Sequence, residues 1–280
     1  PCYREAAVKT LQRGIDLALP GETVLVAPGV YAPVSTGNKR IVIKGVGGYE
    51  KCVIDGGGGN RRCANFGDAS RRYTVMDGFT LRNGCERTGY GISNGGGAYG
   101  GVLRNCLLTG NLASYGGGAY GSELHSCRIE RNRAENAGGG VSESTATSCQ
   151  FVENTAVTES AVEGYSHLYH CTVVGNVVTT SDTSFYGSVN YANFYGSSYV
   201  YDCIIWGNVS ADGSVANCEK IGANYIMNCF AKVTGPVDST AGIRQEDPRL
   251  AVNDAGYYVL PHGCHGVHHR TPCICCGGQN

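Results

Sequence analysis

Apolar and polar positions repeat along the middle of this chain with a period of about 21 residues. In each copy an apolar residue is followed three positions later by cysteine, after two more by another apolar residue, and after three more by asparagine. The steps between copies are 21, 22, 22 and 32 residues, so the last copy carries an insertion of about ten residues. The five copies are Leu103–Asn111, Leu124–Asn132, Ala146–Asn154, Leu168–Asn176 and Val200–Asn208.

This pattern predicts short β-strands, because the cysteine and the apolar residue two positions later share one face of a strand. The residues between them then point outward. A unit of this length cannot bury its own apolar face and must stack on its neighbours. We therefore predict an all-β chain folded as a right-handed parallel β-helix, with one coil per repeat. A leucine-rich horseshoe has a similar period, but its L-x-x-L-x-L pattern is absent.

The start of the chain predicts an amphipathic helix that caps the solenoid and covers its open sheet edges. Its apolar residues recur at helical spacing, at Val8, Leu11, Ile15 and Leu19. We expect a single domain over residues 1–280. Its parts are a capping helix in 1–21, coils in 22–233 with an insertion near 181–201, and a Cys- and His-rich closing segment in 234–280.

The asparagine that ends each copy predicts a structural ladder. Stacked asparagines hydrogen-bond from coil to coil, and asparagine tolerates the left-handed backbone of a tight corner. The predicted ladder residues are Asn111, Asn132, Asn154, Asn176 and Asn208. Glycine triplets at Gly95–Gly97, Gly116–Gly118 and Gly138–Gly140 mark a second corner, where close stacking or a positive φ excludes a side chain.

The cysteines form an inward column of their own. We expect Cys106, Cys127, Cys149 and Cys171 to be mostly reduced and buried, at coil spacings of about 4.8 Å. For Cys52 and Cys63, which flank the glycine-rich turn DGGGGN, we predict a disulfide.

Composition sets the class of protein and its surroundings. The net charge of −1 predicts no affinity for nucleic acid, and no apolar run is long enough for a membrane span. Fifteen cysteines indicate a secreted or cell-surface protein, although several would also serve as small core residues. The chain opens close to a domain start, so we expect a processed mature chain or an excised fragment.

Three stretches carry a resemblance to known families. The segment REAAVKTLQRGIDLALPGETVLVAPGVY, with KRIVIKGVGG and VMDGFTLRNG after it, resembles the opening of bacterial pectate-lyase-like β-helix proteins. Units such as GGAY and FVEN are similar to the repeats of polymorphic outer-membrane adhesins. The closing segment resembles choice-of-anchor Q domain proteins, with Cys275 where their pattern usually has aspartate. The resemblance implies a bacterial surface protein and does not imply an activity.

Few residues of the sequence predict a catalytic site. The outward columns of the aligned strands hold one carboxylate, Glu130, instead of a cluster. GVY at Gly29–Tyr31 resembles a pectin-esterase motif, but the partner segments of that motif are missing. In earlier coils several charged residues either converge on one site or form a solvated charged loop, the reading that we favour. These are Asp55, Asp68 and Asp77 with Arg61, Arg62, Arg71 and Arg72.

Aromatic residues give the strongest recognition signal. Val152, Val174, Ile204 and Trp206 should lie side by side on an outward face, next to a tyrosine-rich insertion. The insertion either shields these residues or forms with Trp206 a site for glycan or protein. The predicted binding residues are Trp206, Tyr186, Tyr191, Tyr195, Tyr199 and Tyr201.

The tail HGCHGVHH and CICC allows a zinc or copper site, but an extracellular setting favours disulfides, so we predict no metal and no cofactor. We expect a non-enzymatic surface module that binds glycan or protein, or assembles with its own copies. The alternative is a polysaccharide lyase or glycoside hydrolase with an atypical site.

Overall fold

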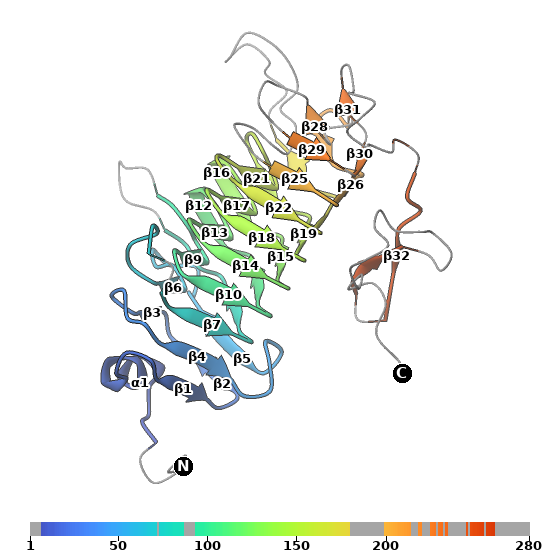
Figure 1. Cartoon of the computed structure of the whole chain (residues 1–280). Helices are drawn as coiled ribbons and strands as arrows, with labels where there is room; N and C mark the ends of the chain where they lie inside the picture. The colour runs from blue at the N-terminus through green and yellow to red at the C-terminus, as the bar shows by residue number, and fades with distance from the viewer. Residues whose placement is uncertain are drawn as a thin grey trace, which may run out of the picture.

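The protein is a parallel β-helix, the predicted fold class, and it rises coil by coil from the N-terminal helix (Figure 1). The computed structural model describes residues 7–71, 73–86, 93–179, 199–213, 218–219, 225–227, 229–231, 233–234, 245, 247–254 and 256–260. Within these residues, short strands stack into four parallel sheets, which we call sheets A to D.

Sheets A and B are the longest. Sheet A contains β1 (Thr23–Val26), β4 (Val42–Gly45), β7 (Val75–Asp77), β10 (Val102–Arg104), β14 (Glu123–His125), β18 (Thr145–Thr147), β22 (His167–Tyr169), β25 (Tyr199–Tyr201) and β29 (Tyr225–Met227). Sheet B contains β2 (Gly29–Tyr31), β5 (Cys52–Asp55), β8 (Thr80–Arg82), β11 (Leu107–Thr109), β15 (Arg128–Glu130), β19 (Gln150–Val152), β23 (Thr172–Val174), β26 (Ile204–Trp206) and β30 (Phe230–Ala231).

Sheets C and D form the rest of each coil. Sheet C contains β3 (Val34–Ser35), β6 (Ala64–Asn65), β9 (Ala98–Tyr99), β13 (Ala119–Tyr120), β17 (Val141–Ser142) and β21 (Val162–Glu163). Sheet D contains β12 (Leu112–Tyr115), β16 (Arg133–Ala137), β20 (Thr155–Ala156), β24 (Val177–Val178) and β27 (Val209–Ser210). Two further pairs are β28 (Cys218–Glu219) with β31 (Val233–Thr234), and β32 (Ala251–Val252) with β33 (Tyr258–Val259).

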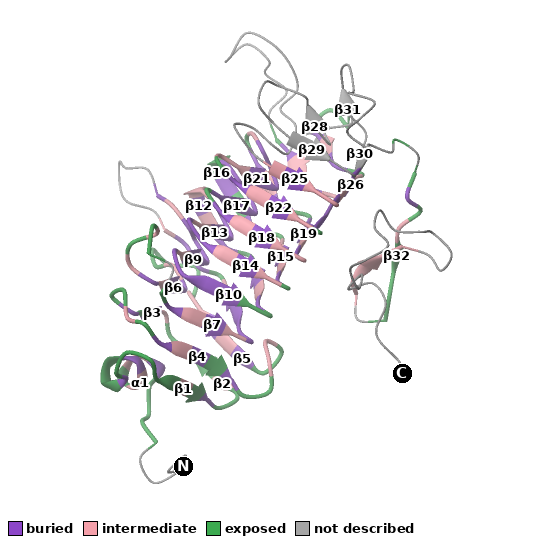
Figure 2. Ribbon diagram, in the orientation of Figure 1, coloured by how far each residue is buried: buried purple, intermediate pink, exposed green. Residues whose placement is uncertain are grey.

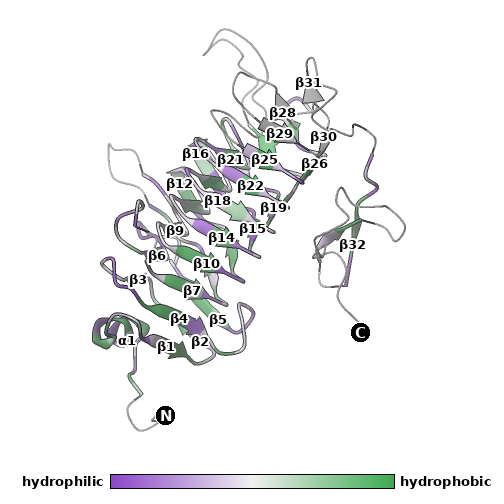
Figure 3. Cartoon of the chain, in the orientation of Figure 1, coloured by the Kyte–Doolittle hydropathy of each residue, from purple (hydrophilic) through white to green (hydrophobic). Residues whose placement is uncertain are grey.

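In the middle coils the chain passes through sheets A, B, D and C and then enters sheet A one coil higher. The predicted alignment holds in the strand register, since Leu103 pairs with Leu124 and Leu108 with Ile129. Inward positions of successive coils therefore stack into one continuous core. Buried residues run through the strands in Figure 2, and Figure 3 shows hydrophobic residues recurring there from coil to coil.

Each corner places a left-handed residue before an inward-facing one. Arg131, with φ of 51°, precedes the buried Asn132, and Ser126, also at 51°, precedes the buried Cys127. The ladder asparagine tolerates this conformation but does not adopt it. The preceding residue makes the turn, which leaves the asparagine side chain free to point inward.

The asparagine ladder is confirmed. The Nδ2 of each asparagine donates to the Oδ1 of the asparagine one coil higher, at 2.9, 3.0, 2.9 and 2.9 Å from Asn111 through to Asn208. All five residues are buried. A serine ladder, which the repeat did not predict, stands at the corner between sheets C and A. There the backbone N–H of Ser122 donates to Ser144, and that of Ser144 donates to Ser166.

The cysteine column points inward as predicted, and its thiols are free and buried. The backbone N–H of Cys127 donates to the sulfur of Cys149 at 3.4 Å, and the same contact recurs up to Cys229. The predicted disulfide between Cys52 and Cys63 is not formed. Strand β5 and the turn after it separate the two thiols. Cys52 lies against the Val26 carbonyl and Cys63 against the Arg82 carbonyl.

The capping helix is shorter than predicted. Helix α1 spans Leu11–Leu17, begins at the N-cap Thr10 and buries Leu11 and Ile15. Val8 and Leu19 lie outside it and are exposed. At its end Lys39 donates to the carbonyls of Ile15, Asp16 and Ala18, which satisfies acceptors of the last turn.

Candidate functional site

The structure separates the aromatic residues that were predicted to form one site. Tyr199 and Tyr201 point outward from sheet A, whereas Trp206 points outward from sheet B. The corner at Asp202, with φ of 54°, turns the chain from one face to the next between them. Tyr186, Tyr191 and Tyr195, which belong to the predicted insertion, lie outside the described residues.

The predicted apolar column on sheet B is confirmed. Val152, Val174 and Trp206 are paired in register on adjacent strands, with Ile204 in the neighbouring column. Val152 and Val174 are buried although they face away from the core, and Trp206 is half-buried. This column is therefore mostly covered.

The charged residues of the early coils do not converge. Asp55 lies on sheet B and pairs with Arg82 at 2.7 Å, while Asp77 lies on sheet A, 4.0 Å from Lys44. Asp68 is in the loop after sheet C and pairs with Arg71 at 3.3 Å. Arg61 is exposed just before β6, and Arg72 lies outside the described residues. Arg62 pairs with Glu86 at 3.2 Å. The three aspartates thus form three separate local contacts.

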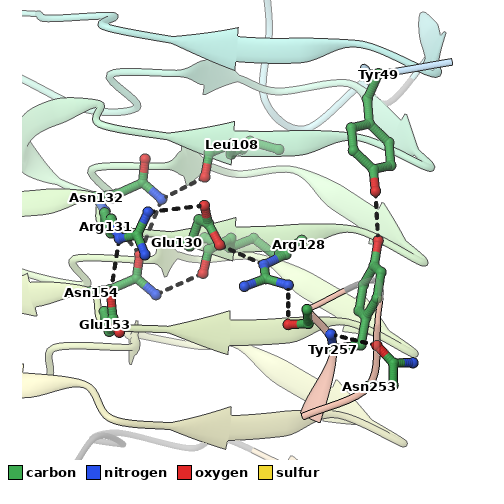
Figure 4. Close-up of polar contacts among 12 residues, drawn as sticks. Tyr49, Leu108, Arg128, Glu130, Arg131, Asn132, Glu153, Asn154, Asn253 and Tyr257 are labelled. Atoms are coloured by element: carbon green, nitrogen blue, oxygen red, sulfur yellow. Dashed lines mark hydrogen bonds and ion pairs between the residues drawn. The ribbon is translucent and has the colours of Figure 1, made fainter. Parts of the chain in front are cut away.

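Charged residues in the middle of sheet B are used to hold the C-terminal hairpin β32–β33 (Figure 4). Arg128 pairs with Glu130 and donates to the Gly256 carbonyl, and its guanidinium lies 5.4 Å from the Tyr257 ring. The hydroxyls of Tyr49 and Tyr257 are 2.9 Å apart. The one carboxylate predicted for the outward columns, Glu130, is therefore part of a docking contact within the chain.

Sheet C brings together a different set of side chains. Its outward column runs from Tyr99 through Tyr120 and Ser142 to Glu163, one residue per coil. The rings of Tyr99 and Tyr120 are stacked with centroids 5.5 Å apart and planes 4° apart. The guanidinium of Arg62 lies 4.7 Å from the Tyr99 ring centre. This stack forms an aromatic platform at one end of the column.

Carboxyl groups lie at the other end of that column. The Ser142 hydroxyl donates to Oε2 of Glu163, and the charge of Glu143 acts on both Tyr120 and Glu163. The third carboxyl belongs to Glu159. We call Glu143, Glu159 and Glu163 the carboxyl cluster.

Glu159 occupies a position that earlier coils give to glycine. The register of sheet C aligns it with Gly95, Gly116 and Gly138, the first residues of the three glycine triplets. Its φ of 40° is in the left-handed region, which glycine adopts freely and glutamate does not. A Cβ at Gly138 would lie 3.0 Å from the Cβ of Glu163. Side chains of this column therefore lie beside the outward column of sheet C.

The surroundings of two of these carboxyls raise their pKa values. Burial, with a smaller effect from the charge of Glu163, raises the pKa of Glu159 to about 7, and only 4 % of this residue is exposed. Burial and the charge of Glu143 also raise the pKa of Glu163. Near neutral pH the cluster therefore holds a proton on a carboxyl that would lose it in water.

Such an arrangement can donate and accept protons. A protonated carboxyl beside a second carboxyl, next to an aromatic platform, has the parts for general acid–base chemistry on a sugar. Within the described residues, no group of three or more His, Cys, Asp or Glu side chains is arranged to hold a metal ion. The His- and Cys-rich tail lies outside them.

Sequence reasoning missed this cluster. The signal was the break in the glycine triplets, since the coil after Gly138–Gly140 has Glu159, Ser160 and Ala161 in their place. A charged residue in a column otherwise reserved for glycine marks a departure from the repeat.

The comparisons with known proteins concern the fold. A scan against protein-family models and a search of curated proteins find no match. Among solved structures, a pectin methylesterase in complex with hexasaccharide VII is similar, at 12% identity and a TM-score of 0.40. That match covers 91% of this chain and 81% of the other.

A second similar structure is the pectin methylesterase from Aspergillus niger, at 15% identity and a TM-score of 0.35. It covers 82% of this chain and 72% of the other. In the described part of the chain, no helix is both long and apolar enough to cross a membrane.

Proposed function

We propose that the protein hydrolyses a polysaccharide at the outward face of sheet C, with Glu159 and Glu163 as the acid–base pair. The observation that carries this proposal is a pair of carboxyls with raised pKa values, Glu163 in the column that continues from two stacked tyrosines and Glu159 in the column beside it. The sugar chain lies over Tyr99 and Tyr120, where ring atoms and hydroxyl groups are both available.

The two carboxyls have different roles because their surroundings differ. Glu159, the more buried, holds the proton at neutral pH and gives it to the glycosidic oxygen as the bond to the anomeric carbon breaks. Glu163, half-buried and held by Ser142, takes the proton of the attacking water, whose oxygen bonds to that carbon. One water is consumed for each bond that is cut.

Substitution of the two carboxyls tests the proposal. The protein is incubated with neutral and acidic polysaccharides, and new reducing ends are measured. We expect Glu163→Gln and Glu159→Gln each to lower the rate by roughly a hundredfold or more. Glu153→Gln, on an exposed carboxylate that pairs with Arg131 at 2.8 Å, is the matched control and should keep full activity.

Two results would reject this function. One is the absence of new reducing ends from every polymer in the set. The other is a rate that stays unchanged in both folded cluster variants, with native melting checked by circular dichroism.

We also propose that the protein is secreted or lies at the cell surface. The resemblance to adhesin-repeat and choice-of-anchor Q proteins supports a secreted or cell-surface location. A non-catalytic binding role for the same protein is favoured by a separate observation, the aromatic residues on sheet A.

A further inference from the structure

The outward face of sheet A carries a second aromatic group, His167, Tyr169, Tyr199 and Tyr201, which we call the tyrosine face. In register, His167 pairs with Tyr199 and Tyr169 with Tyr201, so the four side chains form a block on two adjacent strands. The Tyr169 and Tyr201 rings are 5.7 Å apart with planes 4° apart. Tyr199 and Tyr201 are 6.3 Å apart with planes 6° apart. Three nearly parallel, half-buried tyrosine rings are thus stacked beside one another on this face.

The surface around these rings is rich in hydroxyl groups. One coil earlier, Thr145 and Thr147 occupy the same two outward columns and are half-buried. The charged side chains nearest to the face have partners, since Glu123 contacts His125 at 2.7 Å and His170 lies 3.6 Å from Asp202. The exposed Arg104 lies in the same column, three coils before Tyr169. The tyrosine face therefore offers ring atoms and hydroxyl groups without a fixed charge.

One polar atom on this face, in His167, is buried. Its Nδ1 is buried and has no hydrogen-bond partner among the described residues. Buried polar atoms are almost always paired, and an imidazole nitrogen serves as donor or acceptor. Since this atom is not accessible from the surface, a molecule bound on this face would contact the rings and hydroxyl groups instead.

The shape of the surface suits a polymer. Outward columns repeat every coil, at about 4.8 Å along the helix axis, and form a continuous strip of side chains. A chain with many hydroxyl groups and repeated units meets similar groups at each coil.

We propose that the tyrosine face binds a neutral polysaccharide chain lying along the helix axis, at a site separate from the carboxyl cluster. A neutral polymer is favoured over an acidic one because the face lacks a free cation among the described side chains that form it. The inference does not depend on hydrolysis, since the two sites lie on different sheets.

Affinity electrophoresis tests this site, with neutral polymers (a glucan, a xylan and a mannan) and one polyuronate in the gel. The neutral polymer that slows the wild-type protein should lose its effect on the double variant Tyr169→Ala/Tyr201→Ala, with affinity reduced roughly tenfold or more. Tyr165→Ala, on an exposed tyrosine at the neighbouring corner, is the matched control and should bind as the wild type does. Glu163→Gln should also bind normally, so loss of hydrolysis and loss of binding are scored separately.

A second measurement covers the case in which the double variant does not fold. The ring signals of ¹³C-labelled tyrosines are assigned with Tyr169→Phe and Tyr201→Phe, and a soluble oligosaccharide of the retarding polymer is added to the wild type. We expect the signals of Tyr169 and Tyr201 to shift and that of Tyr165 to stay. The proposal is overturned if no neutral polymer retards the protein, if only the polyuronate does, or if these two signals do not move.

Discussion

At Glu159 a carboxyl side chain occupies a backbone position that three earlier coils give to glycine. The left-handed φ of 40° and the burial of the carboxyl both cost free energy, and the fold holds the residue there between fixed neighbours. Backbone strain and buried ionisable groups are found most often at functional sites. The burial that costs free energy at Glu159 also raises its pKa to about 7, so the carboxyl keeps its proton near neutral pH.

The pKa of Glu159 predicts how stability changes with pH. Its folded-state pKa of about 7 lies above the ordinary value of 4.5, so the folded chain binds the proton more tightly than the unfolded chain. The stabilising effect is complete below about pH 4.5 and is lost as pH rises through about 7, by about 3 kcal/mol. Glu163 contributes in the same direction.

Denaturant unfolding of the wild type and of Glu159→Gln at about pH 5 and about pH 8 measures this effect. We expect the free energy of unfolding of the wild type to fall between the two conditions by more than that of Glu159→Gln. Glu153→Gln should follow the wild type. An equal fall in all three proteins would show that Glu159 does not hold a proton in the folded state.

At the scale of single elements, the sequence predicted what the strand period controls. The inward cysteine and asparagine columns and the outward positions of Val174 and Trp206 all follow from alternation along one strand. The strands of sheet C are only two residues long, so alternation there carried too little information to predict that Tyr120 and Glu163 share a face. The docking of Tyr257 on Tyr49 could not be predicted either, because it joins distant parts of the chain.

The asparagine ladder predicts a purely structural role for its members. Asn154 donates to Asn176 at 2.9 Å and accepts from Asn132 at 3.0 Å. We expect Asn154→Ala to lower the free energy of unfolding by about 1–3 kcal/mol, because buried partners lose their hydrogen bonds. Thr155→Ala, at the neighbouring half-buried position, should cost less. Lost hydrolysis or glycan binding in a folded Asn154→Ala protein with native stability would show that the ladder is functional.

At the scale of the whole molecule, the coils present different chemistry on each face. Sheet C carries the carboxyl cluster, sheet A the tyrosine face, and sheet B the contacts that hold the hairpin β32–β33. The uniform backbone positions these side chains, and departures from the repeat give each face its own properties. A polymer bound on sheet A would keep the protein close to its substrate while sheet C acts on another chain.

The buried thiols test the arrangement of the core. Nine cysteines of the described residues are free and buried, among them Cys52 and Cys63. We expect these nine to resist alkylation in the native protein and to react once the chain is unfolded without reductant. Mass mapping that recovers a Cys52–Cys63 disulfide peptide would contradict the arrangement of the first coils.

If Glu159 and Glu163 hydrolyse a polysaccharide, each cut adds one water, and product analysis in ¹⁸O-labelled water measures this addition. Mass spectrometry should find that each new reducing end carries one ¹⁸O atom. These products should be absent with Glu163→Gln and present with Glu153→Gln. Unsaturated products without the label, or no products from any polymer, would contradict the account.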